Sequence, residues 1–414
     1  MLNSTSNLNK IFLHNRNIFI SYYHILIINN KKHMDESIKI VNLGPIKEIE
    51  IAQIKPFMVL VGESGSGKST VMKVLSLFRW IYKRVNLRSY LRHSQAKDLK
   101  DLTFNMKDLL KFSGIDEYVK ENTEIYYEND GCRISYTKEG LVTPRKVIPQ
   151  DKLSLNKICF ISDKRNEIAD VIAGKTRVEQ TESYFEETLS DFRTAVSEIE
   201  TFPIDYLGIE VKRVKEKNKE RFVISGMDGD DEYTIGLENA SSGIQTVSPL
   251  ALIVEYYAKR YDSVDGMNKS IFRYLADTDG LKHFNATMNV GEILHSNIFI
   301  HIEEPELSLY PESQKSLIDF LISRCFLMEH KDNMSLMMAT HSPYIVNYLN
   351  LLIRRAEAGE SALGPQMNFH DIEVLEIADG YATSLNIEGE QHLIDTRIMS
   401  DPITEIYSEY NKIR

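Results

Sequence analysis

A chain of 414 residues, 43% of them hydrophobic, is long enough to bury one large core or two moderate ones. Its net charge of −11 argues against a general attraction to nucleic acid or to an anionic membrane, so either contact would need a local basic patch. The three cysteines, Cys132, Cys159 and Cys325, lie far apart without a CxxC pair. This usage argues against a disulfide framework or a zinc ribbon and favours the cytoplasm.

Residues 1–33 differ in composition from the rest of the chain, being rich in Asn, Ile, His, Tyr and Lys. Their longest apolar run, IFISYYHILII, is too short to span a bilayer, and no small-residue cleavage site follows it. We expect either a disordered extension or upstream sequence translated in error, with Met34 as the true start. No transmembrane helix is predicted elsewhere, so no membrane contact is expected.

The first elements of the predicted fold are strands separated by turn residues, and β-branched runs indicate them at residues 38–44, 49–54 and 57–62. A Gly-rich loop then leads into a helix over 68–85, whose apolar face consists of Val71, Val74, Leu75 and Phe78. From there to residue 149 the pattern is mixed and polar, which indicates an inserted segment of helix and strand without assigning its elements.

The second half of the chain alternates more regularly between strand and helix patterns. Strands are predicted at residues 157–162, 297–305 and 334–343, with short ones around 372–385. Helices are predicted at residues 176–201, 249–261 and 311–326, and from about 344. Residues 207–226 have the pattern of a hairpin with a charged tip at 215–220.

The segment VGESGSGKST at residues 61–70 matches the phosphate-binding loop GxxxxGK[ST] between a strand and a helix. Its glycines let backbone N–H groups turn inward around phosphates, Lys68 reaches the β and γ oxygens, and Ser69 ligates magnesium. The alternative, a chance Gly-rich turn, is disfavoured by the strand and helix on either side. The predicted nucleotide-binding residues of this loop are Gly62, Glu63, Ser64, Gly65, Ser66, Gly67, Lys68, Ser69 and Thr70.

Two later strands end in polar side chains. IFIHIEEPE ends in Glu303 and Glu304, and we expect Glu303 to hold Mg²⁺ through water and Glu304 to act as the base for the attacking water. The alternative is a pair of solvated acids at the end of a strand. MMATHSP ends in His341, which is placed to contact the γ-phosphate; an isolated His there would more often be a loop residue.

Two further patterns have a simpler explanation that we prefer. Asp277 and Asp279 have a DxD spacing that can bind magnesium, but they read as an ordinary Asp-Gly turn. Arg84, Arg88 and Arg92 share one helical face, which could follow a phosphate backbone or an acidic partner, but a solvated face is the more common reason for such a pattern.

A second Ser-Gly turn, Ser241 and Gly243 in NASSGIQT, precedes another helix. Together with GESGSGKST, IHIEEPELSLYP and ATHSPYI, this segment resembles the motifs of ABC-type ATPases of the SMC/OLD-like branch. Within that branch the chain is similar to the stand-alone AAA-family (ABC-like) ATPases of bacterial anti-phage defence systems. The resemblance implies an α/β fold, a P-loop NTPase with an ABC-type ATPase head over residues 34–414. Helical and β-hairpin segments are inserted at about 85–235, between the phosphate loop and the signature turn.

The resemblance also implies what the second turn does. Ser241 and Gly243 would close over the γ-phosphate held by the phosphate loop of another subunit, so that ATP joins a head-to-tail homodimer, or a higher oligomer. Residues 307–311 correspond to the D-loop that crosses this interface, and His341 to the switch histidine. Glu303 stands where the family often has Asp, and Ser242 replaces the first signature glycine. Two assignments are weaker: Gln95 for the Q-loop, and Arg165 as an additional site residue after a strand.

Three functions fit these motifs. The first is an ATP-hydrolysing dimeric switch that controls a separate effector, such as a nuclease, in anti-phage defence. The alternative is a DNA-repair or recombination ATPase of the RecF or SMC kind. The acidic net charge and the lack of a long coiled coil argue against it, whereas the arginine face would allow a weak nucleic-acid contact. A transporter subunit fits least, since Gly243 and Glu303 lie far apart. The segment after His341 is too short for the nuclease domain of OLD proteins, which favours a separate effector.

Overall fold

The computed structural model describes residues 35–94, 104–176, 183–216, 219–227, 233–277 and 288–413. The chain divides into two compact units, and the second, Glu36–Arg414, holds all the elements described below. The extension predicted at residues 1–33 lies outside the described residues, as do Gln95 and Asp279. None of the described helices is long and apolar enough to cross a membrane.

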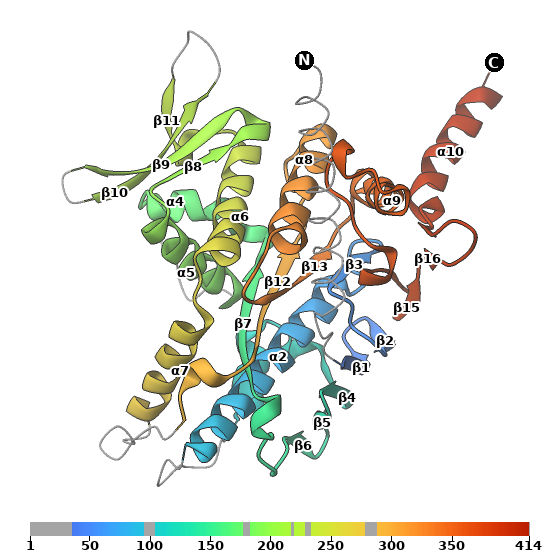
Figure 1. Ribbon diagram of the computed structural model, residues 1–414. Helices are drawn as coiled ribbons and strands as arrows, with labels where there is room; N and C mark the ends of the chain where they lie inside the picture. Colours follow the sequence, from blue (N-terminus) through green and yellow to red (C-terminus); the bar gives the residue numbers. More distant parts are fainter. Residues whose placement is uncertain are drawn as a thin grey trace, which may run out of the picture. The chain divides into compact units, whose positions relative to one another are not determined.

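A six-stranded sheet with the order β15-β14-β3-β13-β12-β7 lies at the centre of the second unit (Figure 1). Its neighbouring strands run parallel, except that β15 is antiparallel to β14. The strands are β3 (Phe57–Val61), β7 (Ser154–Ile161), β12 (His295–Glu303), β13 (Asn333–Ala339), β14 (Ile372–Ala378) and β15 (Tyr381–Ser384). Because β14, β3, β13, β12 and β7 run parallel, their carboxyl ends meet along one side of the sheet.

Each face of this sheet packs against its own hydrophobic core. In β3, Phe57 and Val59 belong to one core and Met58 and Leu60 to the other, as the two-residue period of a strand requires. The first core contains α5 (Ser183–Glu198), α6 (Ser242–Lys259), α8 (Pro311–Ile322) and α9 (Pro343–Ala358). The second contains α2 (Lys68–His93), α3 (Met106–Phe112) and α7 (Ser263–Asp277).

Two antiparallel sheets extend these cores. A five-stranded sheet with the order β2-β1-β4-β5-β6 packs on the side of α2. Its strands are β1 (Glu36–Leu43), β2 (Ile46–Ile51), β4 (Val119–Asn129), β5 (Cys132–Thr137) and β6 (Gly140–Val142). A four-stranded sheet with the order β11-β10-β9-β8 packs on the side of α6. Its strands are β8 (Thr201–Ile204), β9 (Ile209–Glu216), β10 (Lys219–Gly226) and β11 (Thr234–Gly236).

The predicted inserted region, residues 85–235, contributes strands to each of these three sheets. These residues contribute β4–β6 to the sheet that β1 and β2 begin, and β7 to the central sheet. The remaining elements are α4 (Ile168–Ile172), the two-stranded pair of β16 (Asn386–Ile387) and β17 (Leu393–Ile394), and the C-terminal α10 (Arg397–Lys412).

A buried charge network fixes α2 against the central sheet. Arg79 on α2 donates two hydrogen bonds to the carboxylate of Glu36 on β1, at 2.8 and 2.6 Å, and Tyr127 donates another at 2.7 Å. The Arg79 guanidinium also lies 3.1 Å from Nε2 of His301 on β12. Burial lowers the pKa of His301, and the nearby Arg79 charge lowers it further, so the imidazole is neutral. The network holds the helix of the phosphate loop in register with the strand that carries Glu303.

Candidate nucleotide-binding site

The phosphate loop joins the end of β3 to the first residue of α2, as the motif predicts. Its three glycines have positive φ, 142° at Gly62, 80° at Gly65 and 110° at Gly67, a region that side chains disfavour. A Cβ atom on Gly62 would lie 2.3 Å from the carbonyl oxygen of Ile377 on β14. Sterics therefore exclude a side chain at Gly62, and the positive φ at Gly65 and Gly67 favours glycine there.

Lys68 lies buried inside the loop. Its Nζ donates hydrogen bonds to the carbonyl oxygens of Gly62 at 2.9 Å and Glu63 at 2.8 Å. Burial lowers the pKa of Lys68, and the carboxylates of Glu304 and Glu306 oppose that shift. The hydroxyl of Ser66 is buried without a hydrogen-bond partner among the described residues. An ammonium held only by loop carbonyls and an unsatisfied hydroxyl are groups that phosphate oxygens would satisfy.

Ser69 and Glu303, the predicted metal residues, lie together. The Ser69 hydroxyl and the backbone N–H of Asp163 lie close enough to the Glu303 carboxylate to lower its pKa. Burial raises the pKa of Glu303 to about 7; Lys73 opposes the rise and the Asp163 carboxylate adds to it. A bound divalent cation would offset the cost of burying this charge.

These oxygen donors fit Mg²⁺, which is usually held by one or two protein oxygens together with phosphates and water. No group of three His, Cys, Asp or Glu side chains in the described part of the chain could hold a metal by itself, which also fits a cation shared with a nucleotide. Asp163 is an acid beside this site that the sequence motifs do not indicate. It follows β7, and only the pairing of β7 with β12 brings it next to Glu303.

Glu304 and His341 face each other at the ends of β12 and β13. His341 Nε2 lies 3.9 Å from Oε1 of Glu304, and the two side chains are 35% and 41% exposed, so both remain accessible to a substrate. Glu304 has a φ of 43°, and its N–H donates to the carbonyl of Ala339 at 2.8 Å. A left-handed non-glycine residue costs about 1–3 kcal/mol and persists where the surroundings enforce it, as at many functional sites.

Arg165 supplies much of that enforcement. It is completely buried, and its guanidinium donates to the carbonyls of Glu303 at 2.7 Å and Glu304 at 2.6 Å. It also donates at 3.2 Å to the carbonyls of Ser162 after β7 and Thr246 in α6. Burial lowers the pKa of Arg165 to about 10, so it stays charged at neutral pH. Its donors all go to backbone carbonyls, which makes Arg165 a positioning residue.

Glu306, two residues after Glu304, was also missed from the sequence. Its Oε1 accepts the N–H of His341 at 2.6 Å, while its Oε2 is buried without a partner among the described residues. Next to His341, the hydroxyl of Ser342 donates to Oε1 of Gln314 at 2.5 Å. In the sequence, Glu306 is visible only as the third acid of EEPE. Its role comes from its contact with His341 after a neighbouring strand, which the spacing of the acids does not predict.

The Ser-Gly turn begins α6. Ser241 is the exposed N-cap residue, and its hydroxyl accepts a backbone N–H of the first turn at 3.5 Å. A Cβ atom on Gly243 would lie 2.8 Å from the carbonyl oxygen of Ser308, in the predicted D-loop. The Thr246 hydroxyl is 3.0 Å from the carbonyl of Leu307 in the same segment. Within one chain, therefore, the close approach at Gly243 is to the D-loop.

A family model for the AAA ATPase domain matches residues 95–346, which is more than half of the chain. The chain belongs to the AAA ATPase domain family. The matched part includes the Ser-Gly turn, both strand-end acids and His341, while the phosphate loop at residues 61–70 precedes it. This membership and the strand order confirm the predicted α/β P-loop NTPase fold and imply nucleotide binding.

One solved structure similar to this AAA ATPase is that of the recombination mediator protein RecF-ATPrS in the RecFOR pathway. The two share 11% sequence identity, with a TM-score of 0.33, over 85% of this chain and 98% of that chain. Such a likeness is too distant to decide between functions. Comparison with curated proteins gave no match.

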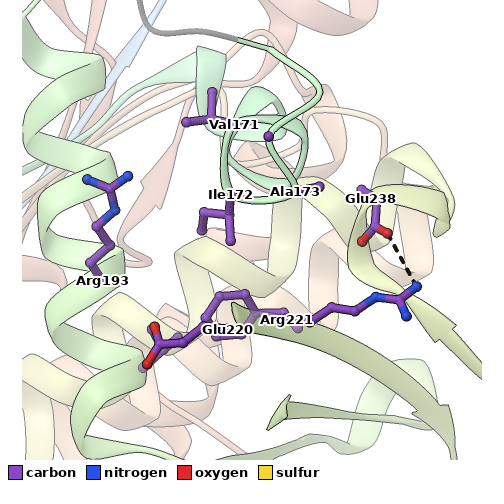
Figure 2. A pocket seen from close by; sticks show the side chains of 10 residues that line it. Val171, Ile172, Ala173, Arg193, Glu220, Arg221 and Glu238 are labelled. Carbon is purple, nitrogen blue, oxygen red and sulfur yellow. Dashed lines mark hydrogen bonds and ion pairs between the residues drawn. The ribbon is translucent and has the colours of Figure 1, made fainter. Parts of the chain in front are cut away.

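This AAA ATPase also has a pocket of about 860 Å³ among α4, α5, β10 and the turn before α6. Figure 2 shows Arg221 and Glu238 paired at one end, with Arg193 projecting from α5. The Arg221 guanidinium lies 3.5 Å from the Glu238 carboxylate. Lys175 donates to the carbonyl of Glu238 and to the side chain of Asn239, so this wall of the pocket adjoins the Ser-Gly turn.

Proposed function

We propose that this chain binds and hydrolyses ATP with Mg²⁺ and that ATP joins two copies of it head to tail. The observation that carries the proposal is the convergence of three groups at one edge of the parallel sheet. These groups are Lys68 in the glycine loop, the neighbouring pair of Ser69 and Glu303, and the facing pair of Glu304 and His341. They come from three separate strands, and they are the parts that phosphoryl transfer to water requires.

Each group in the site has its own role in ATP hydrolysis. The loop N–H groups and Lys68 bind the β- and γ-phosphates, while Ser69 and Glu303 would hold Mg²⁺, which neutralises the charge that develops on the phosphates. The Glu304 carboxylate orients the attacking water and takes its proton, and His341 donates a hydrogen bond to a γ-phosphate oxygen. Breakage of the bond between the γ-phosphorus and the β–γ bridging oxygen then yields ADP and phosphate.

The second half of each site would come from a partner subunit. Ser241 is exposed at the positive end of α6, which suits it to the γ-phosphate held by another chain. Two aromatic side chains next to the site are also strongly exposed: Tyr310 in the predicted D-loop at 77%, and Tyr344 three residues after His341 at 57%. Exposed aromatic side chains beside the partly exposed Glu304 and His341 are typical of a surface that a partner subunit covers.

Such a chain acts as a switch, since ATP holds the assembly together and hydrolysis releases it. We propose a cytoplasmic role in which this switch controls a separate effector protein, such as a nuclease, in anti-phage defence. The resemblance of the four motifs to stand-alone defence ATPases supports this role.

Wild-type protein is expected to gain mass on addition of Mg²⁺ and the slowly hydrolysed analogue ATPγS, and to release phosphate from ATP. Lys68→Ala should do neither, because it lacks the cation that binds the β- and γ-phosphates. Light scattering coupled to size exclusion measures the mass. A wild-type protein that binds ATPγS without any gain in mass, at all concentrations, would contradict ATP-driven association.

A role on nucleic acid, as in ATPases of the RecF or SMC kind, is the second candidate. Arg88 and Arg92 of α2 line one small hollow together with Arg145 and Lys146, which gives an acidic chain a local group of cations. Arg84, predicted on the same face, lies instead over the rings of Trp80 and Tyr274, at 5.8 and 5.3 Å. The cation group therefore lacks Arg84 of the predicted set and adds Arg145 and Lys146.

We expect at most weak nucleic-acid binding at this hollow, falling steeply with salt because it rests on phosphate contacts. Filter binding over a salt series should show retention only at low salt, and Arg88→Ala with Arg92→Ala should abolish it. Lys164→Ala, which removes a cation elsewhere, is the matched control. Tight binding that persists at high salt in the double variant would favour a repair function over the defence switch.

A further inference from the structure

Glu306 lies between the strand-end acid Glu304 and the predicted D-loop. Its backbone is fixed there, because the N–H of Leu307 donates to the carbonyl of Glu304 at 3.0 Å and the N–H of Leu309 donates to the carbonyl of Glu306 at 2.9 Å. The Glu306 side chain reaches the end of the neighbouring strand, where its Oε1 accepts the N–H of His341 at 2.6 Å. A hydrogen bond to a carboxylate is about twice as strong as one between neutral groups. Glu306 therefore joins the end of β12 firmly to the segment that follows β13.

The short segment around His341 is held by three backbone hydrogen bonds, and Glu306 accepts the middle one. Three residues join β13 to α9, and His341 is the second of them. Before it, the N–H of Thr340 donates to the carbonyl of Leu60 on β3 at 3.0 Å. After it, the N–H of Ser342 donates to the hydroxyl of Thr340 at 3.0 Å. The Glu306 carboxylate therefore decides where the backbone of His341, and with it the imidazole, lies between these two fixed neighbours.

A second side chain beside the D-loop holds the residue next to His341. Gln314 in α8 is buried, and its Nε2 donates to the carbonyl of Leu309 at 2.9 Å. Its Oε1 accepts the hydroxyl of Ser342 at 2.5 Å. Gln314 thus fixes Ser342 relative to the D-loop, as Glu306 fixes His341. Because these two side chains come from either side of the D-loop, the position of His341 depends on that loop and not only on its own strand.

The second carboxylate oxygen of Glu306 argues against a purely structural role. Oε2 is buried without a hydrogen-bond partner among the described residues. A buried carboxylate oxygen that has no donor costs free energy, so stability alone would favour another side chain here. Burial lowers the pKa of Lys68 and of Arg165, and the Glu306 carboxylate is among the charges that oppose this shift in both. The carboxylate therefore lies close to the two cations of the candidate site.

We propose that Glu306 is a positioning residue for His341. Its hydrogen bond to the backbone holds the imidazole beside Glu304, where Nε2 of His341 lies 3.9 Å from Oε1 of Glu304, and from there the imidazole donates to the γ-phosphate. Glu306 does not act on the attacking water, because its Oε1 accepts the backbone N–H and its Oε2 is buried. This inference rests on the proposed function, since the group that Glu306 positions is one that ATP hydrolysis uses.

Glu306→Ala is expected to lower kcat by about tenfold to a hundredfold with little change in KM, because a misplaced catalytic group costs rate. Glu306→Gln should keep most of the wild-type kcat, since its amide oxygen still accepts the N–H of His341. Glu312→Ala removes a carboxylate that is 74% exposed and paired with Lys315, so it is the matched control. Phosphate release gives kcat and KM, and melting curves check the fold. If Glu306→Ala melts early, Glu306→Met, which fills a similar space without an acceptor, takes its place.

Two further measurements separate positioning from a general effect on the site. In a His341→Ala background, Glu306→Ala should lower kcat no further, because a residue that acts through His341 then has nothing to position. The second measurement is NMR of the His341 imidazole in full-length protein with isotope-labelled histidine and without nucleotide. Its signal is assigned by its absence from His341→Ala. The signal should shift in Glu306→Ala and keep its wild-type position in Glu306→Gln.

Wild-type kcat in Glu306→Ala, or a further loss in the His341→Ala background, would overturn the proposal. Equal losses in Glu306→Ala and Glu306→Gln would also overturn it, because the charge beside Lys68 and not the bond to His341 would then matter. An imidazole signal that stays in place in Glu306→Ala has the same consequence. The NMR measurement separates this proposal from the proposed function. If wild-type protein releases no phosphate from ATP, the proposed function fails, while a signal that shifts in Glu306→Ala but not in Glu306→Gln still supports the positioning of His341.

Discussion

Glu304→Gln is expected to lower ATP turnover by about a hundred- to ten-thousandfold, the range for the loss of a general base. Gln keeps the shape and hydrogen bonds of the side chain but cannot take a proton from the attacking water. The phosphate loop and the pair of Ser69 and Glu303 stay intact, so ATP should remain bound. Because ATP holds the subunits together, the variant should accumulate in the ATP-bound assembly, measured by size exclusion beside phosphate release.

Glu303→Gln should behave differently. Glu303 is buried against Ser69, and the amide would weaken the cation site without removing the base. Productive binding of Mg²⁺ and ATP should then fail, and no stable assembly should build up. Wild-type turnover in Glu304→Gln would remove Glu304 from the base role. Identical behaviour of the two variants would contradict the division between a metal-holding acid and a base.

Much of the central sheet could be predicted from the sequence, because buried parallel strands are continuous apolar runs bounded by turn residues. The runs that became β3, β12 and β13 are of this kind, and each ends at, or within two residues of, a residue of the candidate site. The predicted hairpin with its tip at 215–220 is also confirmed, as β9 and β10. The phosphate loop was predictable for the same reason, since its motif joins a buried strand to a helix.

Other elements gave no clear pattern. β4, VKENTEIYYEN, is largely polar in its first half, because it pairs in a sheet with a solvent-facing side. The helices α7 and α10 contain Gly266 and Pro402, residues that usually indicate a turn or the end of a helix. In α7, packing against the core that contains α2 outweighs this local preference, and no pattern within one segment reports such contacts.

The candidate site, too, could be predicted only in part from the sequence. Glu304 and His341 could be proposed because each follows an apolar strand, but Asp163 and Glu306 act through neighbours on other strands. Arg165 could be only a weak candidate from its place after a strand. Its importance became visible through the four backbone carbonyls that it contacts, and these come from three different parts of the chain. Such convergence depends on strand order, which one sequence does not encode locally.

Replacing Ser241 in the Ser-Gly turn should also abolish ATP hydrolysis if the turn completes the site of a partner chain. Ser241→Arg should still bind ATP through the intact loop around Lys68, yet lose hydrolysis, because the long side chain blocks the γ-phosphate of the partner. Ser241 is exposed and its cap contributes only about 1 kcal/mol, so the fold should survive. Lys68→Ala should also be inactive, but through loss of its own phosphate site. Unchanged melting curves and ATP binding by Ser241→Arg are the controls.

Phosphate release by a mixed assembly of these two inactive chains tests the composite site most directly. The chains carry different affinity tags, are produced together, and are purified by both tags in turn. In the mixed pair, one site combines an intact phosphate loop with an intact Ser-Gly turn, while the other lacks both. The mixed pair is expected to show about half of the wild-type turnover. A mixed pair that is folded and associated but as inactive as either variant alone would contradict it.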